Sequence, residues 1–139
     1  MELLTIGYVK KSAMTFFEML ENNRIDVLVD IRLYNSSQLA GFTKSKDLKY
    51  FARELCGCEY KWVPQFAPTA ELLNGYKAGN IDWNEYERIY RQLLDTRGGL
   101  DFFDEFDGKR VCLLCAEDMP QRCHRRLLAE RVSDRVVHL

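Results

Sequence analysis

The sequence carries almost no excess charge of either sign. Its 20 Lys and Arg residues are matched by 21 Asp and Glu residues, so the formal net charge over 139 residues is −1. Sequence-independent binding of nucleic acid depends on a basic surface, and a basic field over the whole molecule is therefore excluded. A local basic patch is still allowed, so nucleic acid is a disfavoured partner rather than an excluded one.

Long apolar runs are missing as well. None approaches the roughly 20 residues that a membrane-spanning helix needs. The N-terminal sequence MELLTIGYVKK lacks the charged lead, apolar core and cleavage site of a signal peptide. From these two absences we expect no membrane partner and a cytoplasmic location.

Cysteine is present but sparse and odd in number, at positions 56, 58, 112, 115 and 123. Five cysteines in 139 residues fall well below the ~8–10% typical of a disulfide scaffold. Without a secretory signal, reduced thiols are the expected state rather than a disulfide framework.

Short apolar runs alternate with helical periodicity along the whole chain. The runs at 3–6, 27–31, 59–63, 110–115 and 135–138 indicate strands. Helices are expected after Ser12, Ser45 and Asp82 and from about Pro120, with Gly57 ending the second one. This order predicts one α/β domain over residues 1–139, in three layers, with a mainly parallel sheet of about five strands and helices on both faces.

The connection over residues 64–81 is long for so small a domain, and a loop of this kind is usually functional. Residues 69–77 within it are expected to form a turn or two of helix. The aromatic residues around it are expected to pack in the core or in a lid, and the alternative is a stacking surface for a flat ligand. They are Trp62, Phe66, Tyr76 and Trp83.

Polar residues follow the predicted strands where each one ends. In an open parallel sheet, ligands bind beyond these carboxyl ends. Asp30 and Arg32 lie two apart, so they point the same way in an extended segment. They form either a local ion pair or, with Arg32 as a fork for phosphate or carboxylate, part of a ligand site.

Cys115 ends the most apolar strand and precedes the last helix. A helix N-terminus lowers the pKa of a nearby thiol, so Cys115 is the candidate nucleophile, against the alternative of a small buried apolar residue. Asp30, Glu117 and His124 complete the catalytic candidates as acids or bases.

An anion site is expected beside this thiol. Arg122 and Arg125 are three apart, on one face of the expected helix, and a helix N-terminus favours anions. Together with Arg32, Tyr8 and Thr5 they form the predicted anion-binding set. The alternative for the arginines is a solvated helix face.

A metal ion is not expected. Cys115, Cys123 and His124 could approach one another, and they would be the ligands if an ion were bound. The spacing C-x7-C-H is not a standard zinc spacing, however, and no second close pair completes four ligands. No cofactor is assigned.

Several longer strings of this sequence resemble the family known as domain of unknown function 488. The strings are Thr5-Ile6-Gly7-Tyr8, Leu28-Val29-Asp30-Ile31-Arg32, and Cys115-Ala116-Glu117 with Pro120 and Cys123-His124-Arg125. The family often has His at the position of Tyr8 and Pro at that of Asn35. The resemblance implies a compact α/β fold and a site drawn from positions 30, 32, 115, 117, 123, 124 and 125, but no substrate.

The residues therefore favour an enzyme with a strand-end Cys/Glu/Arg site that binds a small anionic molecule resembling a phosphate or nucleotide. Two alternatives stay open. One is a nucleic-acid-binding or regulatory module, and the other is a metal-binding structural domain. The oligomeric state is not indicated.

Overall fold

A five-stranded sheet forms the centre of the computed structural model, which describes residues 1–36 and 41–139. The strand order is β3-β2-β4-β1-β5, and all four pairings are parallel. The strands are β1 (Glu2–Gly7), β2 (Val27–Asp30), β3 (Glu59–Trp62), β4 (Val111–Cys115) and β5 (Arg135–His138). The predicted α/β class and parallel sheet are confirmed.

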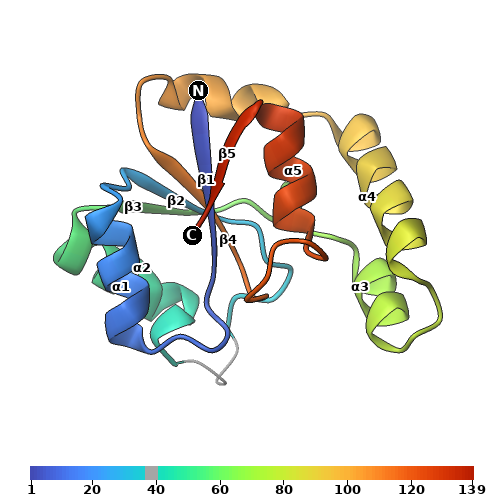
Figure 1. Ribbon diagram of the computed structural model, residues 1–139, viewed down its shortest axis with the longest axis horizontal. Helices are drawn as coiled ribbons and strands as arrows, with labels where there is room; N and C mark the ends of the chain where they lie inside the picture. The colour runs from blue at the N-terminus through green and yellow to red at the C-terminus, as the bar shows by residue number, and fades with distance from the viewer. Residues whose placement is uncertain (37–40) are drawn as a thin grey trace.

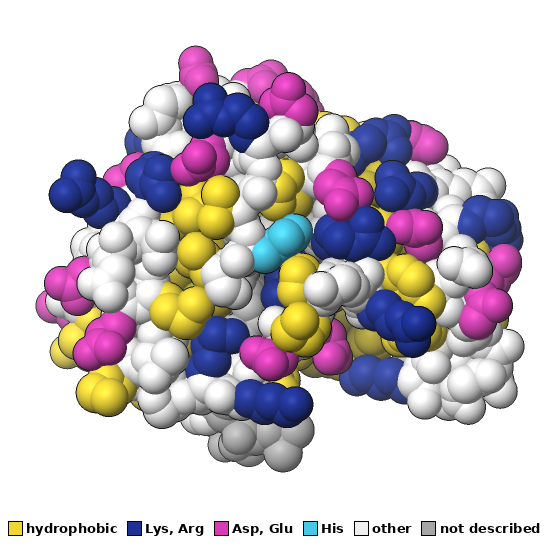
Figure 2. Space-filling view, in the orientation of Figure 1, with side chains coloured by type: hydrophobic (Ala, Val, Ile, Leu, Met, Phe, Trp, Pro, Cys, Tyr) yellow, Lys and Arg dark blue, Asp and Glu magenta, His cyan; other side chains and the backbone are white. Residues whose placement is uncertain are grey.

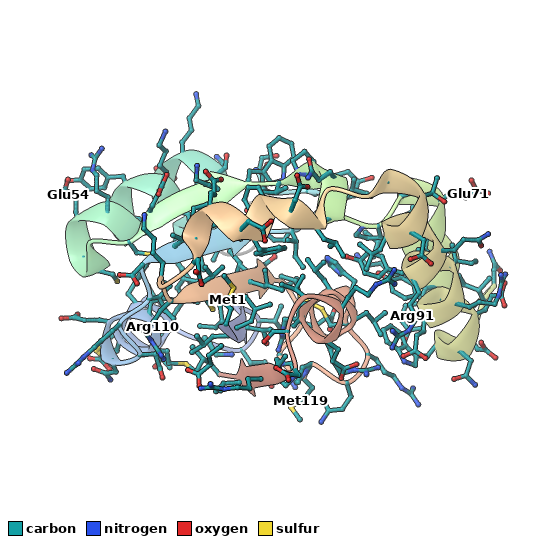
Figure 3. The ribbon with its side chains drawn as sticks, turned by 90° about the horizontal axis from the view of Figure 1, so that it is seen from above. Met1, Glu54, Glu71, Arg91, Arg110 and Met119 are labelled. Atoms are coloured by element: carbon teal, nitrogen blue, oxygen red, sulfur yellow. A yellow bond between two sulfur atoms is a disulfide. The ribbon has the colours of Figure 1, made fainter. Side chains whose placement is uncertain are left out.

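Helices cover both faces of this sheet. They are α1 (Ala13–Asn22), α2 (Ser45–Cys56), α3 (Ala70–Lys77), α4 (Trp83–Arg97) and α5 (His124–Val132). Three 3-10 helices are η1 (Gly41–Thr43), η2 (Pro64–Phe66) and η3 (Leu100–Phe106). Figure 1 shows α1 and α2 on one side of the strands and α3, α4 and α5 on the other. From above, α5 lies between the sheet and α4 (Figure 3).

Two apolar cores correspond to these two sides. Because strand side chains alternate, Leu28 and Leu114 pack with Phe16 under α1 and α2, whereas Val29 and Leu113 face α4 and α5. The central strands β2 and β4 are buried along their whole length. This explains why they read as continuous apolar runs rather than alternating ones.

Side-chain caps begin three of the helices. Ser12, Thr69 and Asp82 each accept a hydrogen bond from the backbone N–H three residues later. Gly57 ends α2 with φ of 63°, the left-handed conformation that glycine adopts without a Cβ penalty. The caps expected at Ser12 and Asp82 and the stop at Gly57 are confirmed.

The predicted start of the last helix is wrong. Helix α5 begins at His124 with Cys123 as its N-cap, not near Pro120. Pro120 instead sits in a turn, where its carbonyl accepts the Cys123 N–H at 3.2 Å. Arg122 therefore lies outside the helix and is exposed, so it shares no helix face with Arg125.

The long connection after β3 is mostly ordered into η2 and α3. Phe66 is fully buried, and the Trp83 ring stacks on Tyr86 at 5.0 Å and meets Tyr76 at 5.7 Å. Packing on the core is confirmed for Phe66, Tyr76 and Trp83, whereas the prediction is wrong for Trp62, which is 46% exposed. The loop predicted over 34–43 ends in η1, and residues 37–40 lie outside the described part.

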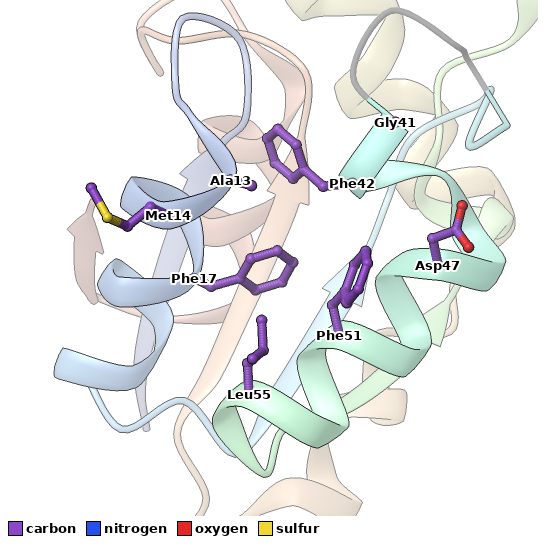
Figure 4. A pocket seen from close by; sticks show the side chains of 8 residues that line it. All are labelled: Ala13, Met14, Phe17, Gly41, Phe42, Asp47, Phe51 and Leu55. Carbon is purple, nitrogen blue, oxygen red and sulfur yellow. The ribbon is translucent and has the colours of Figure 1, made fainter.

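An apolar groove lies between α1 and α2 (Figure 4). Phe17, Phe42 and Phe51 line its floor, and the exposed Leu55 and Met14 stand at its edges. Among the described helices, none is both long and apolar enough to span a bilayer.

Candidate functional site

The polar residues at the carboxyl edge of the sheet form two clusters, one on each face. The Arg32 cluster (Tyr8, Asp30, Arg32, Tyr60 and Trp62) begins on the α1/α2 side, because Asp30 pairs in register with Leu114. The Cys115 cluster (Thr5, Cys115, Cys123, His124 and Arg125) lies on the α5 side. The sequence placed Tyr8, Asp30, Arg32 and Cys115 on one rim but did not separate the faces.

Asp30 is held by four hydrogen bonds inside the Arg32 cluster. Its Oδ1 accepts from Arg32 Nε at 2.8 Å and from the Arg32 backbone N–H at 3.1 Å. Its Oδ2 accepts from Arg32 Nη2 at 2.7 Å and from the Tyr60 hydroxyl at 2.6 Å. The predicted local ion pair is therefore present, and Asp30 is fully buried within it. The Asp30 carboxylate fixes the position of the Arg32 guanidinium.

One nitrogen of the Arg32 guanidinium stands apart from this network. Nη2 also donates to the Thr43 carbonyl at 2.8 Å, but buried Nη1 has no hydrogen-bond partner among the described residues. The Tyr8 ring lies 5.3 Å from the guanidinium carbon, at cation–π distance. Burial lowers the pKa of Arg32, but the bonds and charge of Asp30 outweigh it and leave the pKa raised, so the group stays charged.

The sequence did not assign Tyr60 or Trp62 to this cluster. It gave no role to Tyr60, which lies in β3, and it grouped Trp62 with the long loop, whereas Trp62 Nε1 donates to the Arg32 carbonyl at 3.0 Å. Both reach the cluster because β3 pairs with β2. The order of strands in a sheet cannot be predicted from residue types alone. Burial, followed by the neighbouring Asp30, raises the pKa of the Tyr60 hydroxyl.

Cys115 and Cys123 meet on the opposite face. Their sulfur atoms are joined as a disulfide, and their Cα atoms are 7.8 Å apart. Both residues are buried. The cysteines at 56, 58 and 112 form no disulfide. The expectation of reduced thiols therefore does not hold for this pair in the structure.

His124 bridges this cluster and the end of β2. Its Nε2 lies 2.8 Å from the Ile31 carbonyl oxygen, which can only accept, so Nε2 carries the hydrogen. The other ring nitrogen, Nδ1, lies 3.9 Å from Cys123 Sγ. Burial lowers the pKa of His124 to about 4, which keeps the ring neutral at physiological pH.

Arg125 is fully buried and holds the loop after β4 in place. Its guanidinium donates to Thr5 Oγ1 at 3.2 Å, to the Asp118 carbonyl at 3.1 Å and to the Glu117 carbonyl. Nη1 also lies 3.3 Å from Cys115 Sγ. No carboxylate in the described ranges forms a salt bridge with it.

Gly7 makes this arrangement possible. A Cβ on Gly7 would lie 1.6 Å from the Glu117 carbonyl oxygen and 2.8 Å from Arg125 Nη1. The loop after β4 therefore lies directly against the backbone at the end of β1. The glycine stands in the Thr5–Tyr8 string of the sequence, but only the structure shows why a side chain is excluded there.

The other predicted site residues differ in exposure. Thr5 is buried, and its hydroxyl lies 2.6 Å from Nδ1 of His138, whereas the Glu117 side chain is exposed. On the face shown in Figure 2, acidic and basic side chains are intermixed rather than gathered by sign. A continuous basic patch is not visible on that face.

Three of these side chains could hold a metal ion. One ligand atom from each of Cys115, Cys123 and His124 lies within 4.8 Å of the others, and all three residues are buried. Two sulfurs and an imidazole nitrogen suit zinc and related transition metals. The sequence identified this trio but rejected it on spacing.

Comparison with known proteins gives a family and nothing more specific. No curated protein and no solved structure matches the chain. A family model described as "Domain of unknown function DUF488" matches residues 12–132, a range that contains every residue of both clusters except Thr5 and Tyr8. The chain therefore belongs to the DUF488 family, as its motifs predicted.

Proposed function

We propose that this protein is an enzyme that binds a small anionic molecule at the carboxyl edge of the sheet, with Arg32 as the anchor and the Cys115 cluster as the reacting group. The observation that carries the proposal is that Nη1 of Arg32 is buried without a hydrogen-bond partner in residues 1–36 and 41–139. A buried N–H group without an acceptor costs about 1–3 kcal/mol, and a ligand oxygen would remove that cost.

The rest of the guanidinium supports a ligand role for this one nitrogen. Asp30 and Thr43 fix Nε and Nη2, so the direction of Nη1 is set before any ligand arrives. Because guanidinium bonds to phosphate and carboxylate are charge-assisted, an anionic oxygen is the acceptor that this nitrogen favours.

The reacting group lies one strand away. Ile31 N–H bonds to the Leu114 carbonyl at 3.1 Å, so Ile31 and Cys115 come from adjacent strands, which lie about 4.8 Å apart. A molecule placed over this edge could touch Arg32 on one side and the Cys115 cluster on the other. Once the disulfide is reduced, the Arg125 guanidinium next to the Cys115 sulfur would stabilise a thiolate there, and a thiolate is both a nucleophile and a metal ligand.

Titration of the protein with inorganic phosphate, followed by NMR of the arginine Nε–H groups, tests the anchor. We expect the Arg32 signal to shift in wild-type protein and phosphate binding to weaken at least tenfold in Arg32→Lys, because lysine lacks the fork. Arg122→Lys is the matched control, since Arg122 is exposed beyond the same edge. An Arg32 signal that does not move at millimolar phosphate, AMP or a dicarboxylate would exclude the anchor.

The thiol role has its own measurement. In reduced protein, a limiting dose of iodoacetamide should label Cys115 before the other cysteines. Peptide mapping by mass spectrometry identifies the labelled residue. Labelling that is unchanged in Cys115→Ser would remove Cys115 as the reactive thiol.

A further inference from the structure

The Cys115 cluster has the composition of a metal centre. We infer that, once Cys115 and Cys123 are reduced, their sulfurs and His124 Nδ1 bind a divalent transition metal of the zinc class, with a fourth position open. This inference rests on the same cluster that the proposed function uses as its reacting group, but it needs no ligand at Arg32.

The geometry of the three donors is the first support. Their ligand atoms lie within 4.8 Å of one another. The Cα atoms of the two cysteines are 7.8 Å apart, beyond the ~4.4–6.8 Å that most disulfides span. Two thiolates that share an ion tolerate a wider spacing, because two metal–sulfur bonds of about 2.3 Å stand in place of one sulfur–sulfur bond.

The second support is the hydrogen bond from His124 to Ile31. Metal-binding histidines commonly donate the other ring N–H to a backbone carbonyl, which fixes the tautomer and the ring orientation. Nε2 donates to Ile31 at 2.8 Å, so the lone pair of Nδ1 is left facing Cys123 Sγ at 3.9 Å. The imidazole is therefore already oriented as a ligand.

The third support is the charge of Arg125. A fully buried guanidinium without a counter-charge is costly, and no carboxylate pairs with it in the described chain. Cys115 Sγ, at 3.3 Å, can supply that charge as a thiolate but not as half of a disulfide. In a centre with a divalent ion, the Cys115 sulfur stays a hydrogen-bond acceptor for Arg125, and the remaining counter-charge falls to the group in the fourth position.

The open position gives the centre a use. Structural zinc sites have four protein ligands, whereas catalytic ones have three protein ligands and a water or substrate in the fourth position. Two thiolates neutralise the divalent ion, and Arg125 adds one positive charge. A hydroxide or one oxygen of an anionic molecule in the fourth position would balance that charge, which agrees with the proposed substrate class.

Loading starts from the joined cysteines and needs an external dithiol reductant. The dithiol is oxidised to its own disulfide, and its two electrons and two protons convert Cys115 and Cys123 to thiols. The metal then displaces the thiol protons as it binds. The reduced, metal-free protein is therefore the starting material for the test.

Cobalt(II) titration of this reduced protein under anaerobic conditions is the experiment. We expect about one Co²⁺ per chain, with sulfur-to-cobalt charge-transfer absorption. That absorption should be lost in Cys115→Ser and Cys123→Ser and altered in His124→Asn, while Cys56→Ser behaves as wild type. The Cys123 side chain makes no N-cap hydrogen bond, and serine is favoured at N-cap positions, so Cys123→Ser should fold in reduced protein.

A measurement on wild-type protein removes any dependence on variants. Bound Zn²⁺ should protect Cys115 and Cys123 from iodoacetamide, with Cys56 as the internal control. Uptake below about 0.1 ion per chain in folded reduced protein, or full uptake in Cys123→Ser, would overturn the metal centre. The phosphate titration at Arg32 uses metal-free protein, so either proposal can fail alone.

Discussion

Arg32 grips the carboxylate of Asp30, two residues before it, through Nε at 2.8 Å and Nη2 at 2.7 Å, and both side chains are buried. The two side chains form a buried ion pair at the carboxyl end of β2. Breaking one partner of a buried pair costs far more than the pair itself contributes, because the remaining charge stays buried.

Asp30→Asn keeps the shape of the side chain but removes this charge. We expect the free energy of unfolding to fall by about 3–5 kcal/mol, because Arg32 is left without its counter-charge. Urea denaturation followed by circular dichroism measures the loss. Tyr60→Phe, which removes one hydrogen bond to the Asp30 carboxylate but no charge, should cost less, about 1.5–3 kcal/mol. Equal losses in the two variants would contradict the ion pair as the main interaction of the Asp30 carboxylate.

Gly7→Ala should destabilise the protein and disturb the Cys115 cluster. The new methyl group would overlap the Glu117 carbonyl, so the loop after β4 must move, at a cost of about 1–3 kcal/mol. Thermal unfolding measures this cost.

Gly75→Ala is the matched control for that substitution. Gly75 lies inside α3, and a Cβ added there would lie 3.8 Å from the Ile81 side chain, which is ordinary van der Waals contact. Alanine should raise the unfolding temperature there, because it lowers the conformational entropy of the unfolded chain. A Gly7→Ala variant as stable as wild type would contradict the close approach of the loop.

Cys58 should give stability that is lost at alkaline pH. Burial, followed by the neighbouring Cys56, raises the pKa of the Cys58 thiol to about 12, against ~8.5 in an unfolded chain. The folded state therefore favours the neutral thiol. The contribution is complete below the unfolded pKa and is lost as the pH rises toward 12.

Denaturation in reducing buffer at about pH 8 and about pH 10 tests this pH dependence, with Cys58→Ala as the comparison. The stability of wild type should fall by ~2 kcal/mol more than that of Cys58→Ala over this interval, because only the wild-type thiol ionises on unfolding. Parallel losses in both proteins would assign the effect to other groups.

Binding to generic DNA or RNA should be absent even at low salt. Electrostatic binding needs clustered basic side chains, and the face in Figure 2 intermixes both signs. Fluorescence anisotropy with labelled single- and double-stranded oligonucleotides, over a salt series, measures this. Affinity that falls steeply with salt would support the nucleic-acid-binding alternative.

The elements were predictable because apolar spacing reports burial. Runs without alternation marked the covered strands β2 and β4, and the i, i+3, i+4 spacing marked α1, α2 and α4. The start of α5 was not predictable from Pro120. The loop before it is fixed by Arg125, whose guanidinium bonds to carbonyls seven and eight residues earlier.

The candidate residues were predictable in type but not in grouping. Strand ends carry Asp30, Arg32 and Cys115 to one edge, as topology requires. Which face each one joins depends on the register between β2 and β4 and on the strand order that brings Tyr60 beside Asp30. Neither the register nor the strand order can be predicted from local residue spacing. The sequence therefore predicted a single site at this edge, whereas the structure has two clusters on opposite faces.

The hydrogen bond from His124 to Ile31 connects these two clusters directly. Its acceptor is the carbonyl of the peptide unit that leads directly into Arg32. If the proposed ligands bind, a shift of the imidazole would act on that peptide, and a ligand that moves Arg32 would act on the imidazole through the same bond. Linkage would then be reciprocal. If a metal ion at the Cys115 cluster changes the affinity of Arg32 for an anion by some factor, the anion changes the affinity of the Cys115 cluster for the metal by the same factor.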